Sequence, residues 1–290
     1  MLNPSPLRYP GGKFKLYRFI SALVSYNNCS TYIEPFAGGS AISFALLFNG
    51  VVKRVVINDY DYSIYCFWDS VLNKTEDFIK LIQNTPVTLE EWHKQKLIRE
   101  KVYDNDPLKV GFSTFYLNRT NRSGIIDKAG PIGGLGQTGK FPIDCRFNKE
   151  ELIKRILKIS KYKESIRLYN MDAMDFAELE ITKTRNSFTF FDPPYYKKGR
   201  ELYTNFYTHG DHENLAKTII HLMGKRKWIV TYDTAKEIKN LYSRFDMITF
   251  SLSYTLQEKK SGIEYMFFSK KIKRLNNEHD YINIISNPML

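Results

Sequence analysis

The sequence predicts an α/β protein with a doubly wound, largely parallel sheet and a mainly helical insert. Three observations predict this class. β-prone runs alternate with stretches of helical spacing in the first and last thirds of the chain. That alternation stops in the middle third, and several β-prone runs end in an acid or a glycine-rich turn. Because strand–helix–strand units build parallel sheets, we expect the two outer thirds to share one core.

The first third opens with apolar positions at helical spacing, followed by two strand–helix units. The expected strands are short and β-branched, and a glycine-rich turn lies between the first strand and its helix. The predicted elements are a helix over 13–27, a strand over 31–35, a helix from 38–40 to 47, a strand over 53–57 and a helix over 62–72.

The middle third predicts several helices over 73–118, one of them over 89–103, and a helix over 149–162. Between them lies a basic, glycine-rich segment over 118–140, expected to form a hairpin or a long binding loop. Asn, Gln and Arg interleaved with glycines suit contacts to base edges and phosphates, although a plain surface loop has a similar composition.

The last third returns to the α/β alternation. Strands are expected at 166–169, 187–191, 227–231, 246–250 and 264–269, with a helix over 212–223. The predicted organisation is a core made of 1–72 and 162–272, an insert over 73–161, and a polar tail over 273–290 with little function.

The charge balance favours a polyanionic partner. The 290 residues include 43 Lys and Arg against 31 Asp and Glu, a net charge of +12, and many of the basic residues lie in the middle third. Three widely spaced cysteines give no disulfide framework, so a reduced cytoplasm is expected. No signal peptide or membrane span is indicated. His209 and His212 do not make a zinc pattern, so no metal is expected, and a monomer is the default.

The most informative motif is Asp192-Pro193-Pro194-Tyr195, directly after the expected strand over 187–191. Two prolines fix φ and lack N–H donors, so the turn holds the acid and the Pro193 carbonyl in place. One carboxylate, one carbonyl and the ring of Tyr195 suit a flat ligand with an exocyclic amine, such as a nucleobase. A simple Pro-Pro turn with a capping Asp is the alternative.

A second motif, over 34–40, follows the first expected strand and allows a ligand to approach the backbone. It contains the candidate cofactor-binding residues Glu34, Phe36 and Gly38. Asp59 lies 59 − 38 = 21 residues beyond Gly38, close to the spacing of the acid that binds ribose hydroxyls in doubly wound folds. Asp172 is either a third acid, facing an adenine amine, or the N-cap of the turn over 173–177.

Taken together, these motifs resemble the Dam-type, D12-class DNA adenine-N6 methyltransferases, which use S-adenosylmethionine. The matching pieces occur in the family's order over roughly residues 7–270: Arg8-Tyr9-Pro10-Gly11-Gly12-Lys13, Glu34-Pro35-Phe36-Ala37-Gly38-Gly39-Ser40, Asn58-Asp59, Asn118-Arg119, Asp192-Pro193-Pro194-Tyr195 and Ile229-Val230-Thr231-Tyr232. The resemblance implies a Rossmann-like methyltransferase core with a target-recognition domain as the insert. It also implies that the cofactor site contains Tyr9, Lys13, Phe36, Gly38, Asp59 and Asp192.

The reaction implied is transfer of a methyl group to N6 of an adenine flipped out of double-stranded DNA. Tyr195 would stack on the base, while Asp192 and the Pro193 carbonyl would accept the two N6–H bonds. Tyr203, Phe206 and Tyr207 are expected either to line the base pocket or to pack in the interior. The candidates for DNA contact, each of which could instead touch a phosphate or only solvent, are Arg119, Asn121, Arg122, Gln137 and Lys140.

Two other functions remain open from the sequence. One is N4-cytosine methylation, and the other is a catalytically silent DNA-binding relative. Where GATC-reading members have a Phe-Asn-Val-Pro-like stretch, this chain has Phe141-Pro142-Ile143-Asp144, which leaves the target sequence open. The sequence also does not distinguish a restriction–modification enzyme from a phage or housekeeping one.

Overall fold

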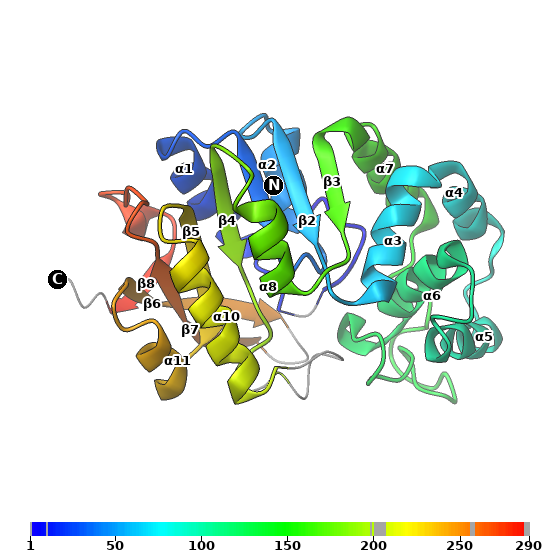
Figure 1. The fold of residues 1–290 in the computed structure, drawn as a ribbon. Coiled ribbons are helices and arrows are strands. Elements are labelled where there is room, and N and C mark those ends of the chain that lie inside the picture. The colour runs from blue at the N-terminus through cyan, green and yellow to red at the C-terminus, as the bar shows by residue number, and fades with distance from the viewer. Residues whose placement is uncertain (1, 10, 198, 200–206, 256–258, 287–290) are drawn as a thin grey trace.

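An eight-stranded sheet forms the centre of the molecule, in the order β3-β2-β1-β4-β5-β7-β6-β8 (Figure 1). The computed structural model describes residues 2–9, 11–197, 199, 207–255 and 259–286. Strands β1 to β5 are mutually parallel, while β7 runs antiparallel to β5 and β6, and β8 antiparallel to β6. The strands are β1 (Thr31–Glu34), β2 (Arg54–Asn58), β3 (Ile166–Tyr169), β4 (Ser187–Phe191), β5 (Lys227–Asp233), β6 (Asp246–Thr255), β7 (Lys259–Phe268) and β8 (Asn283–Ser286).

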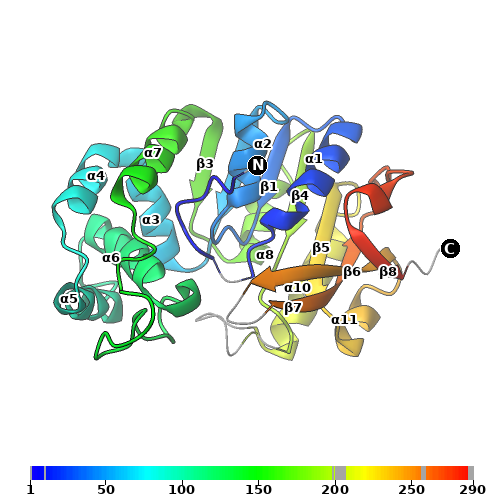
Figure 2. The same cartoon turned by 180° about the vertical axis from the view of Figure 1, so that it is seen from behind.

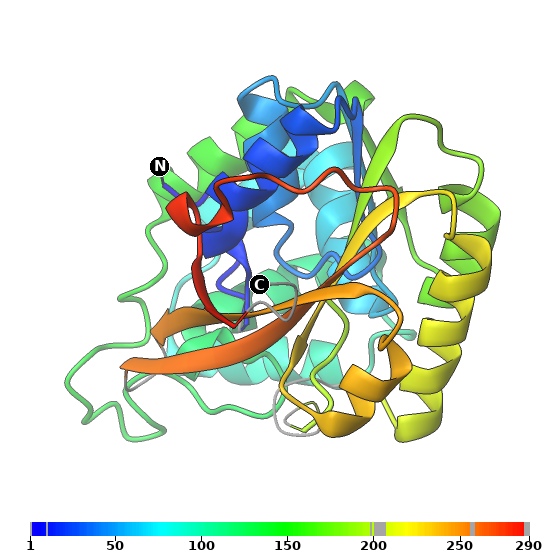
Figure 3. The same cartoon turned by 90° about the vertical axis from the view of Figure 1, so that its left-hand side faces the viewer.

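Helices cover both faces of this sheet and one of its edges. α1 and α2 lie on one face and α8, α10 and α11 on the other (Figure 3), while α3 to α7 gather beside β3 (Figure 1). The helices are α1 (Tyr17–Tyr26), α2 (Ala41–Phe48), α3 (Tyr62–Asn73), α4 (Thr75–Asn84), α5 (Leu89–Glu100), α6 (Pro107–Thr120), α7 (Lys149–Ser160), α8 (Ala173–Phe176), α10 (His209–Leu222) and α11 (Lys236–Leu241). Short 3-10 turns occur at Phe14–Leu16, Arg122–Gly124, Lys163–Ser165 and Glu278–Asp280, and a π-turn at Ala177–Ile181.

Each face of the sheet has its own hydrophobic core. The core on the α1 and α2 side continues into α3 to α7 and includes Phe19, Phe44 and Trp68. The core on the other side packs Trp228 and Tyr232 against α8, α10 and α11. Every residue of β1 and β4 is buried, as expected for central parallel strands covered on both faces. The predicted α/β class is confirmed.

The chain order of the sheet determines where a ligand can bind. From β1 the chain continues to β2 on one side, and from β4 it continues to β5 on the other, although β1 and β4 are neighbours. The connections therefore diverge at the carboxyl ends of β1 and β4, and in open α/β sheets the ligand crevice lies at this switch point. Glu34 ends β1 and Asp192 follows β4 at this place.

The helical group occupies the region where the sequence predicted helices. α5 ends at Glu100, three residues before the predicted limit. α3, which follows β2 in the chain, packs against α6 of this group. The N-terminal stretch runs between this group and the sheet (Figure 2). Asn118 of α6 holds it there: the backbone N–H of Arg8 donates to Asn118 Oδ1 at 2.7 Å, and Asn118 Nδ2 donates to the carbonyl of Arg8 at 3.1 Å.

The glycine-rich segment forms a long loop rather than a hairpin. Within 121–148, all of which the structure describes, the only strand-like pairing is an isolated bridge between Asn121 and Pro131. Gly133 and Gly134 have φ of +84° and +76°, a region that favours glycine. Of the two alternatives left open by the sequence, the loop is therefore the one observed.

The tail contains a strand that the sequence did not predict. β8 pairs antiparallel with β6 at the edge of the sheet. Its four residues are mostly exposed, so they show no alternation of buried and exposed positions that a sequence pattern could reveal. All the strands that the sequence predicted are present, and β7 lies between β5 and β6.

Candidate active site

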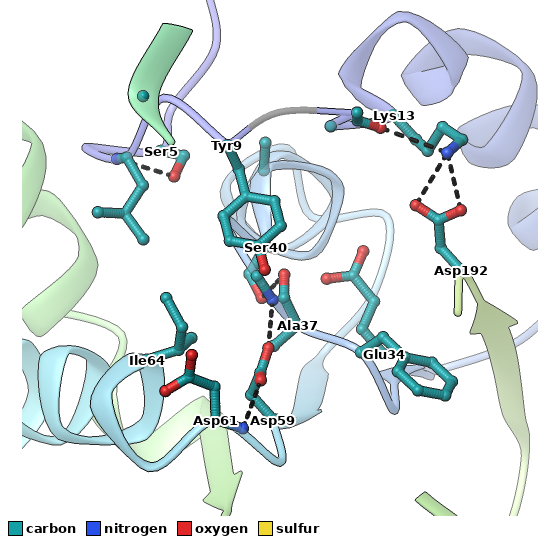
Figure 4. Close-up of a pocket in the computed structure, with 18 of the residues that line it drawn as sticks. Ser5, Tyr9, Lys13, Glu34, Ala37, Ser40, Asp59, Asp61, Ile64 and Asp192 are labelled. Carbon is teal, nitrogen blue, oxygen red and sulfur yellow. Dashed lines mark hydrogen bonds and ion pairs between the residues drawn. The ribbon is translucent and has the colours of Figure 1, made fainter. Parts of the chain in front are cut away.

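The carboxylate of Asp192 lies just beyond the carboxyl end of β4, where a fully buried strand meets two prolines. The ammonium of Lys13 lies 2.8 Å from its Oδ1 and 3.1 Å from its Oδ2 (Figure 4). Thr231, on the neighbouring strand β5, donates a hydrogen bond to Oδ1 at 2.7 Å. The carboxylate is thus fixed from two sides, yet 24 % of the side chain stays exposed for a ligand.

Lys13 connects Asp192 to a second, more deeply buried acid. Its ammonium is 3.6 Å from Glu264 Oε2 and donates to the hydroxyl of Tyr195 at 3.2 Å. The Tyr195 hydroxyl in turn donates to Glu264 Oε1 at 2.7 Å. One buried cation is therefore shared by two carboxylates, the arrangement that a buried ammonium needs. The sequence analysis missed Glu264, because β7 gave no motif around it.

The position of Tyr195 differs from the sequence prediction. We expected its ring to be presented to a flat ligand, but the side chain is only 8 % exposed and is turned toward Lys13, which lies 4.8 Å from the ring centre. Pro194, not Tyr195, is among the residues that line the pocket. The reason is the buried acid: Glu264 gives the phenol a strong acceptor inside the protein.

Asp59 holds the turn after β1. Its Oδ2 accepts the backbone N–H of Gly38 at 2.8 Å, and its Oδ1 accepts the backbone N–H of Asp61 at 3.0 Å. Burial raises the pKa of Asp59 to about 7, and the nearby charge of Asp61 adds to the increase, while the two backbone bonds oppose it. This carboxyl with a raised pKa also lines the pocket.

Tyr9 explains why glycine follows β1. The turn at Gly38 has φ of +45°, and a Cβ at this position would lie 2.7 Å from the Tyr9 ring. The indole N–H of Trp68 donates to the Gly38 carbonyl at 2.9 Å and so also holds the turn in place. A larger residue at position 38 would displace the ring from the pocket wall.

Glu34 is a second carboxyl with a raised pKa at the same edge of the sheet. It is 6 % exposed, and its Oε2 has no hydrogen-bond partner among the described residues. Burial raises the pKa of Glu34 to about 7 even though Tyr32, Ser40 and Ser43 lie close enough to lower it. A buried acceptor without a partner, at the wall of a pocket, is a place for a donor from a ligand.

Asn58, at the end of β2, joins the loops after β1 and β3 at the pocket, a role that the sequence analysis did not assign to it. Its Nδ2 donates to the carbonyls of Pro35 and Met171, both at 3.0 Å, and its Oδ1 accepts the N–H of Met171 at 2.9 Å. The backbone carbonyl of Asn58 also accepts the N–H of Ala37 at 2.8 Å. The available signal was an amide residue placed directly before the predicted acid.

Seven of the predicted cofactor-binding residues line one pocket (Figure 4). They are Tyr9, Lys13, Glu34, Phe36, Gly38, Asp59 and Asp192. Tyr207 joins them and meets the Phe36 ring edge-on, with 6.0 Å between centroids. Tyr203 and Phe206, expected either beside the base or in the interior, lie outside the described residues.

The long loop forms one wall of this pocket, which the sequence did not predict. Residues 124–128 line it together with residues at the ends of the strands, such as Glu34 and Asp192. Arg99, on α5, holds this wall in place: it bonds Asp127 through Nε and Nη2, at 2.7 and 2.9 Å, and Asp61 through Nη2 at 3.2 Å. The Arg99 side chain is 9 % exposed, so one largely buried cation ties the long loop to Asp61, the N-cap of α3.

Comparison with known proteins identifies the family. The family model of the D12 class N6 adenine-specific DNA methyltransferases matches residues 9–256. The chain belongs to this family. It is an adenine-specific DNA methyltransferase, which decides between the adenine and cytosine alternatives left open above.

Individual relatives share about a quarter of their residues with this methyltransferase. It is 26% identical over 206 residues to the Type II methyltransferase M.MjaIII of Methanocaldococcus jannaschii, covering 65% of this chain and 68% of that protein. It is 25% identical over 247 residues to the Type II methyltransferase M.CviBI of Paramecium bursaria Chlorella virus NC1A, covering 82% and 86%. The match to Modification methylase StsI of Streptococcus sanguinis, at 27% identity, covers 66% of this chain but only 28% of that longer protein.

Asp172 of this methyltransferase has the capping role that was one of its two expected roles. Its Oδ1 accepts the N–H of Met174 and begins α8. The residue also lines a second pocket, together with Tyr60 and Met171, and Tyr60 lines the first pocket as well. A cap uses one carboxylate oxygen, so the role toward an adenine amine stays a prediction.

Two of the five predicted DNA contacts are structural residues of the methyltransferase. Asn121 is 1 % exposed: its Oδ1 accepts the indole N–H of Trp92 at 2.6 Å, and its Nδ2 donates to the carbonyls of Ile125 and Ile126. Gln137 donates to two carbonyls of its own loop and accepts the N–H of Ile143. Base reading by Asn121 or Gln137 is therefore not supported, because their polar groups are bonded within the protein.

The other three predicted contacts are basic residues with different surroundings. Arg122 and Lys140 are exposed, and Lys140 lies over the ring of Phe141. Arg119 is half-buried and bonds two backbone carbonyls, those of Arg146 and Pro6. Arg122 and Lys140 thus keep the freedom that a DNA contact requires.

Metal and membrane motifs do not emerge from the described part of the chain. No group of three or more potential metal ligands occurs among its His, Cys, Asp and Glu residues. His212, half of the considered pair, is buried and bonded to Tyr232, and burial lowers the pKa of His212 to about 4. Within the same residues, no helix has the length and apolar character needed to cross a membrane.

Proposed function

We propose that this methyltransferase uses S-adenosylmethionine to methylate N6 of an adenine rotated out of double-stranded DNA. The observation that carries the proposal is the Asp192 carboxylate, fixed by Lys13 and Thr231 and partly exposed to the pocket that also holds Glu34 and Asp59. Inside a duplex the N6 amine is paired and stacked, so a base must leave the helix to reach such an acid.

The pocket residues fit the proposed cofactor. The Glu34 Oε2 can accept a bond from an ammonium group, and the Asp59 carboxylate suits ribose hydroxyls. The bare backbone at Gly38 leaves room for Tyr9 to lie flat against the turn, and Phe36 supplies an apolar ring. Bound S-adenosylmethionine supplies an electrophilic methyl group.

Asp192 is proposed to act on the amine itself. Its exposed carboxylate would accept one N6–H bond, and the Pro193 carbonyl the other. This would leave the nitrogen lone pair free to form the new N–C bond while the S–CH3 bond of the sulfonium breaks and its electron pair stays on sulfur as a neutral thioether. After transfer the amine carries one proton too many, and the carboxylate is placed to take it or pass it to solvent. Lys13 and Thr231 keep the acid in this orientation, so the gain comes from alignment.

Two aromatic residues, Tyr207 and Tyr195, are proposed to receive the base. Tyr207 lines the pocket already, as does Pro194. Tyr195 is nearly buried in this structure, so its ring would have to become accessible before it could stack on the base. Base–aromatic stacking typically contributes about 1–3 kcal/mol.

The insert over 73–161 is proposed to be the target-recognition domain, with Arg122 and Lys140 on its long loop as contacts to DNA. An exposed guanidinium can pair bidentately with guanine, whereas a lysine more often binds a phosphate. Because the relatives are named type II methyltransferases, we place the enzyme in a restriction–modification setting. We propose a monomer.

The reaction can be tested by expressing the chain in a host without DNA methylation and mapping modified bases by long-read sequencing. We expect N6-methyladenine at one short motif, and none with Asp192→Ala. Unmodified DNA from cells with folded protein that binds S-adenosylmethionine would contradict the proposal. Modified cytosine would contradict the adenine assignment.

A further inference from the structure

Four arginines converge where the N-terminal stretch meets α6 and α7. Arg119 donates through Nε to the carbonyl of Arg146 at 2.7 Å and through Nη1 to that of Pro6 at 3.5 Å. Arg155 donates through Nη1 to the carbonyl of Ser5 at 3.0 Å. These bonds go to backbone oxygens, so they position the guanidiniums without neutralising them. We call Arg8, Arg119, Arg146 and Arg155 the arginine cluster.

The cluster contains more positive charge than its surroundings balance. Within the part of the chain that the structure describes, Arg155 pairs with Glu151 at 3.0 Å, whereas Arg8, Arg119 and Arg146 form no ion pair with a carboxylate. Burial lowers the pKa of Arg119 to about 9, and the charges of Arg8, Arg155 and Arg146 lower it further. Like charges gathered this way disfavour the folded protein unless an anion joins them.

The backbone around Arg8 is unusually well fixed. Asn118 bonds both its N–H and its carbonyl, and Gly124 packs so tightly against it that a Cβ there would lie 2.1 Å from the Arg8 carbonyl. The next residue, Tyr9, lines the active-site pocket. The cluster is therefore rigidly joined to the pocket, and the N-terminal stretch that carries Arg8 lies between the helical group and the sheet (Figure 2).

We propose that the arginine cluster binds one phosphate of the DNA backbone and so sets the position of the target strand relative to Asp192. This inference rests on the proposed function, which makes DNA the polyanion. A phosphate has the charge and the several acceptor oxygens that such a group of guanidiniums needs. Two backbone bonds hold the Arg119 guanidinium, so of the contacts that the sequence left open for this residue, the one to a phosphate is proposed.

Arg146 is the best position at which to test the proposal. Its side chain is exposed, and the bond that it makes to Arg119 uses its backbone carbonyl, so Arg146→Gln removes a charge without removing that bond. Arg185→Gln is a matched control: Arg185 is also exposed, and it precedes β4, at the end of the sheet opposite the pocket.

The measurement is the binding of a fluorescent duplex by the full chain at several salt concentrations. One duplex contains the methylated motif and a second contains a scrambled one. We expect Arg146→Gln to weaken both by a similar factor, about tenfold, and to reduce the slope of log K against log salt by about 0.9, the loss of one phosphate contact. Arg185→Gln should change neither quantity.

Each outcome decides a different claim. An unchanged slope for Arg146→Gln, in a preparation whose parent protein methylates DNA, would overturn the phosphate site alone. Weaker binding to the motif duplex only would overturn it too, because a phosphate contact carries no sequence information. If the parent protein neither methylates nor binds DNA, the proposed function fails, and the phosphate site fails with it.

Discussion

The carboxyl edge of the parallel strands and the long loop between α6 and α7 treat polar side chains in opposite ways. At the strand edge, Glu34, Asp59 and Asp192 all face one pocket. In the loop, Asn121 and Gln137 use their amides on nearby protein groups. The strand-edge carboxylates can still accept bonds from a ligand even where, as at Asp59, each oxygen already accepts one backbone N–H, whereas the loop amides are used up within the protein.

The difference follows from the backbone. Within a sheet the strands pair with each other, so the N–H and C=O groups are satisfied and the side chain after each strand is left for other partners. A loop without such pairing leaves its carbonyls and amides in need of partners. Asn121 satisfies the carbonyls of Ile125 and Ile126 for this reason. Polar residues in a long loop are therefore weak candidates for ligand contact until their own backbone is accounted for.

The largest effect is expected at the strand edge, from Asp192→Asn. The amide keeps the size of the carboxylate but loses the charge and one acceptor, so kcat should fall by about 10³-fold, in the range seen when one preorganised group is removed. DNA affinity should stay within about threefold of the parent protein. Asp175→Asn, at an exposed position of α8, is the control. A parallel loss of DNA binding in folded protein would contradict a purely catalytic role.

A stability effect is expected in the loop, from Asn121→Ala. It leaves the buried indole N–H of Trp92 and two partly buried carbonyls without their partner, which should lower the free energy of unfolding by about 3 kcal/mol. Urea unfolding measures this loss. Asn73→Ala, which removes an exposed bond to Asp69, should cost less than about 0.5 kcal/mol. If Asn121→Ala keeps its stability but loses sequence discrimination, Asn121 reads DNA after all.

The sequence predicted the strand edge well because the physics there is local. A buried run followed by an acid, as at Phe191-Asp192, places the acid at a known edge of a known sheet. The spacing between Gly38 and Asp59 likewise corresponds to a direct hydrogen bond of 2.8 Å.

Contacts between distant segments were not predictable in this way. Glu264 meets Lys13 only because β7 enters the sheet between β5 and β6. No sequence pattern predicts this order of strands. The same long-range packing brings the Tyr195 side chain to Glu264. It also brings residues 124–128 to the wall of the pocket. In a single sequence such pairs are separated by tens of residues and leave no periodic signal.

Arg99→Gln tests whether the two regions act together, because Arg99 joins Asp61 beside the strand edge to Asp127 in the loop. The change leaves two acids without their shared cation at the pocket wall, so S-adenosylmethionine should bind about tenfold more weakly. Isothermal titration calorimetry measures this, with Lys94→Gln on the surface of α5 as the control. Unchanged affinity would show that the loop wall does not contribute to cofactor binding.

The smallest expected effect is a pH dependence of cofactor binding. It is caused by the two carboxyls at the strand edge whose pKa values are raised. Asp59 and Glu34 each have a pKa raised to about 7, so each is only partly ionised near neutral pH. The proposed contacts use the ionised forms as acceptors, so affinity should rise with pH. For a group of this pKa the ionised fraction grows about threefold between pH 6.5 and 7.5, and the association constant should follow for each carboxyl that takes part.

The sign for stability without ligand is the opposite. A carboxyl whose pKa is higher in the folded protein than in the unfolded chain stabilises the fold fully only below the unfolded value, and this contribution is lost as pH rises through about 7. Calorimetric titrations from pH 6 to 8.5 should show binding that strengthens with pH, while the stability of the free protein falls up to about pH 7 and is level above it. Glu34→Gln should make the pH profile of binding shallower by removing one of the two titrations. A flat profile in the parent protein would mean that neither acid meets the cofactor in its charged form.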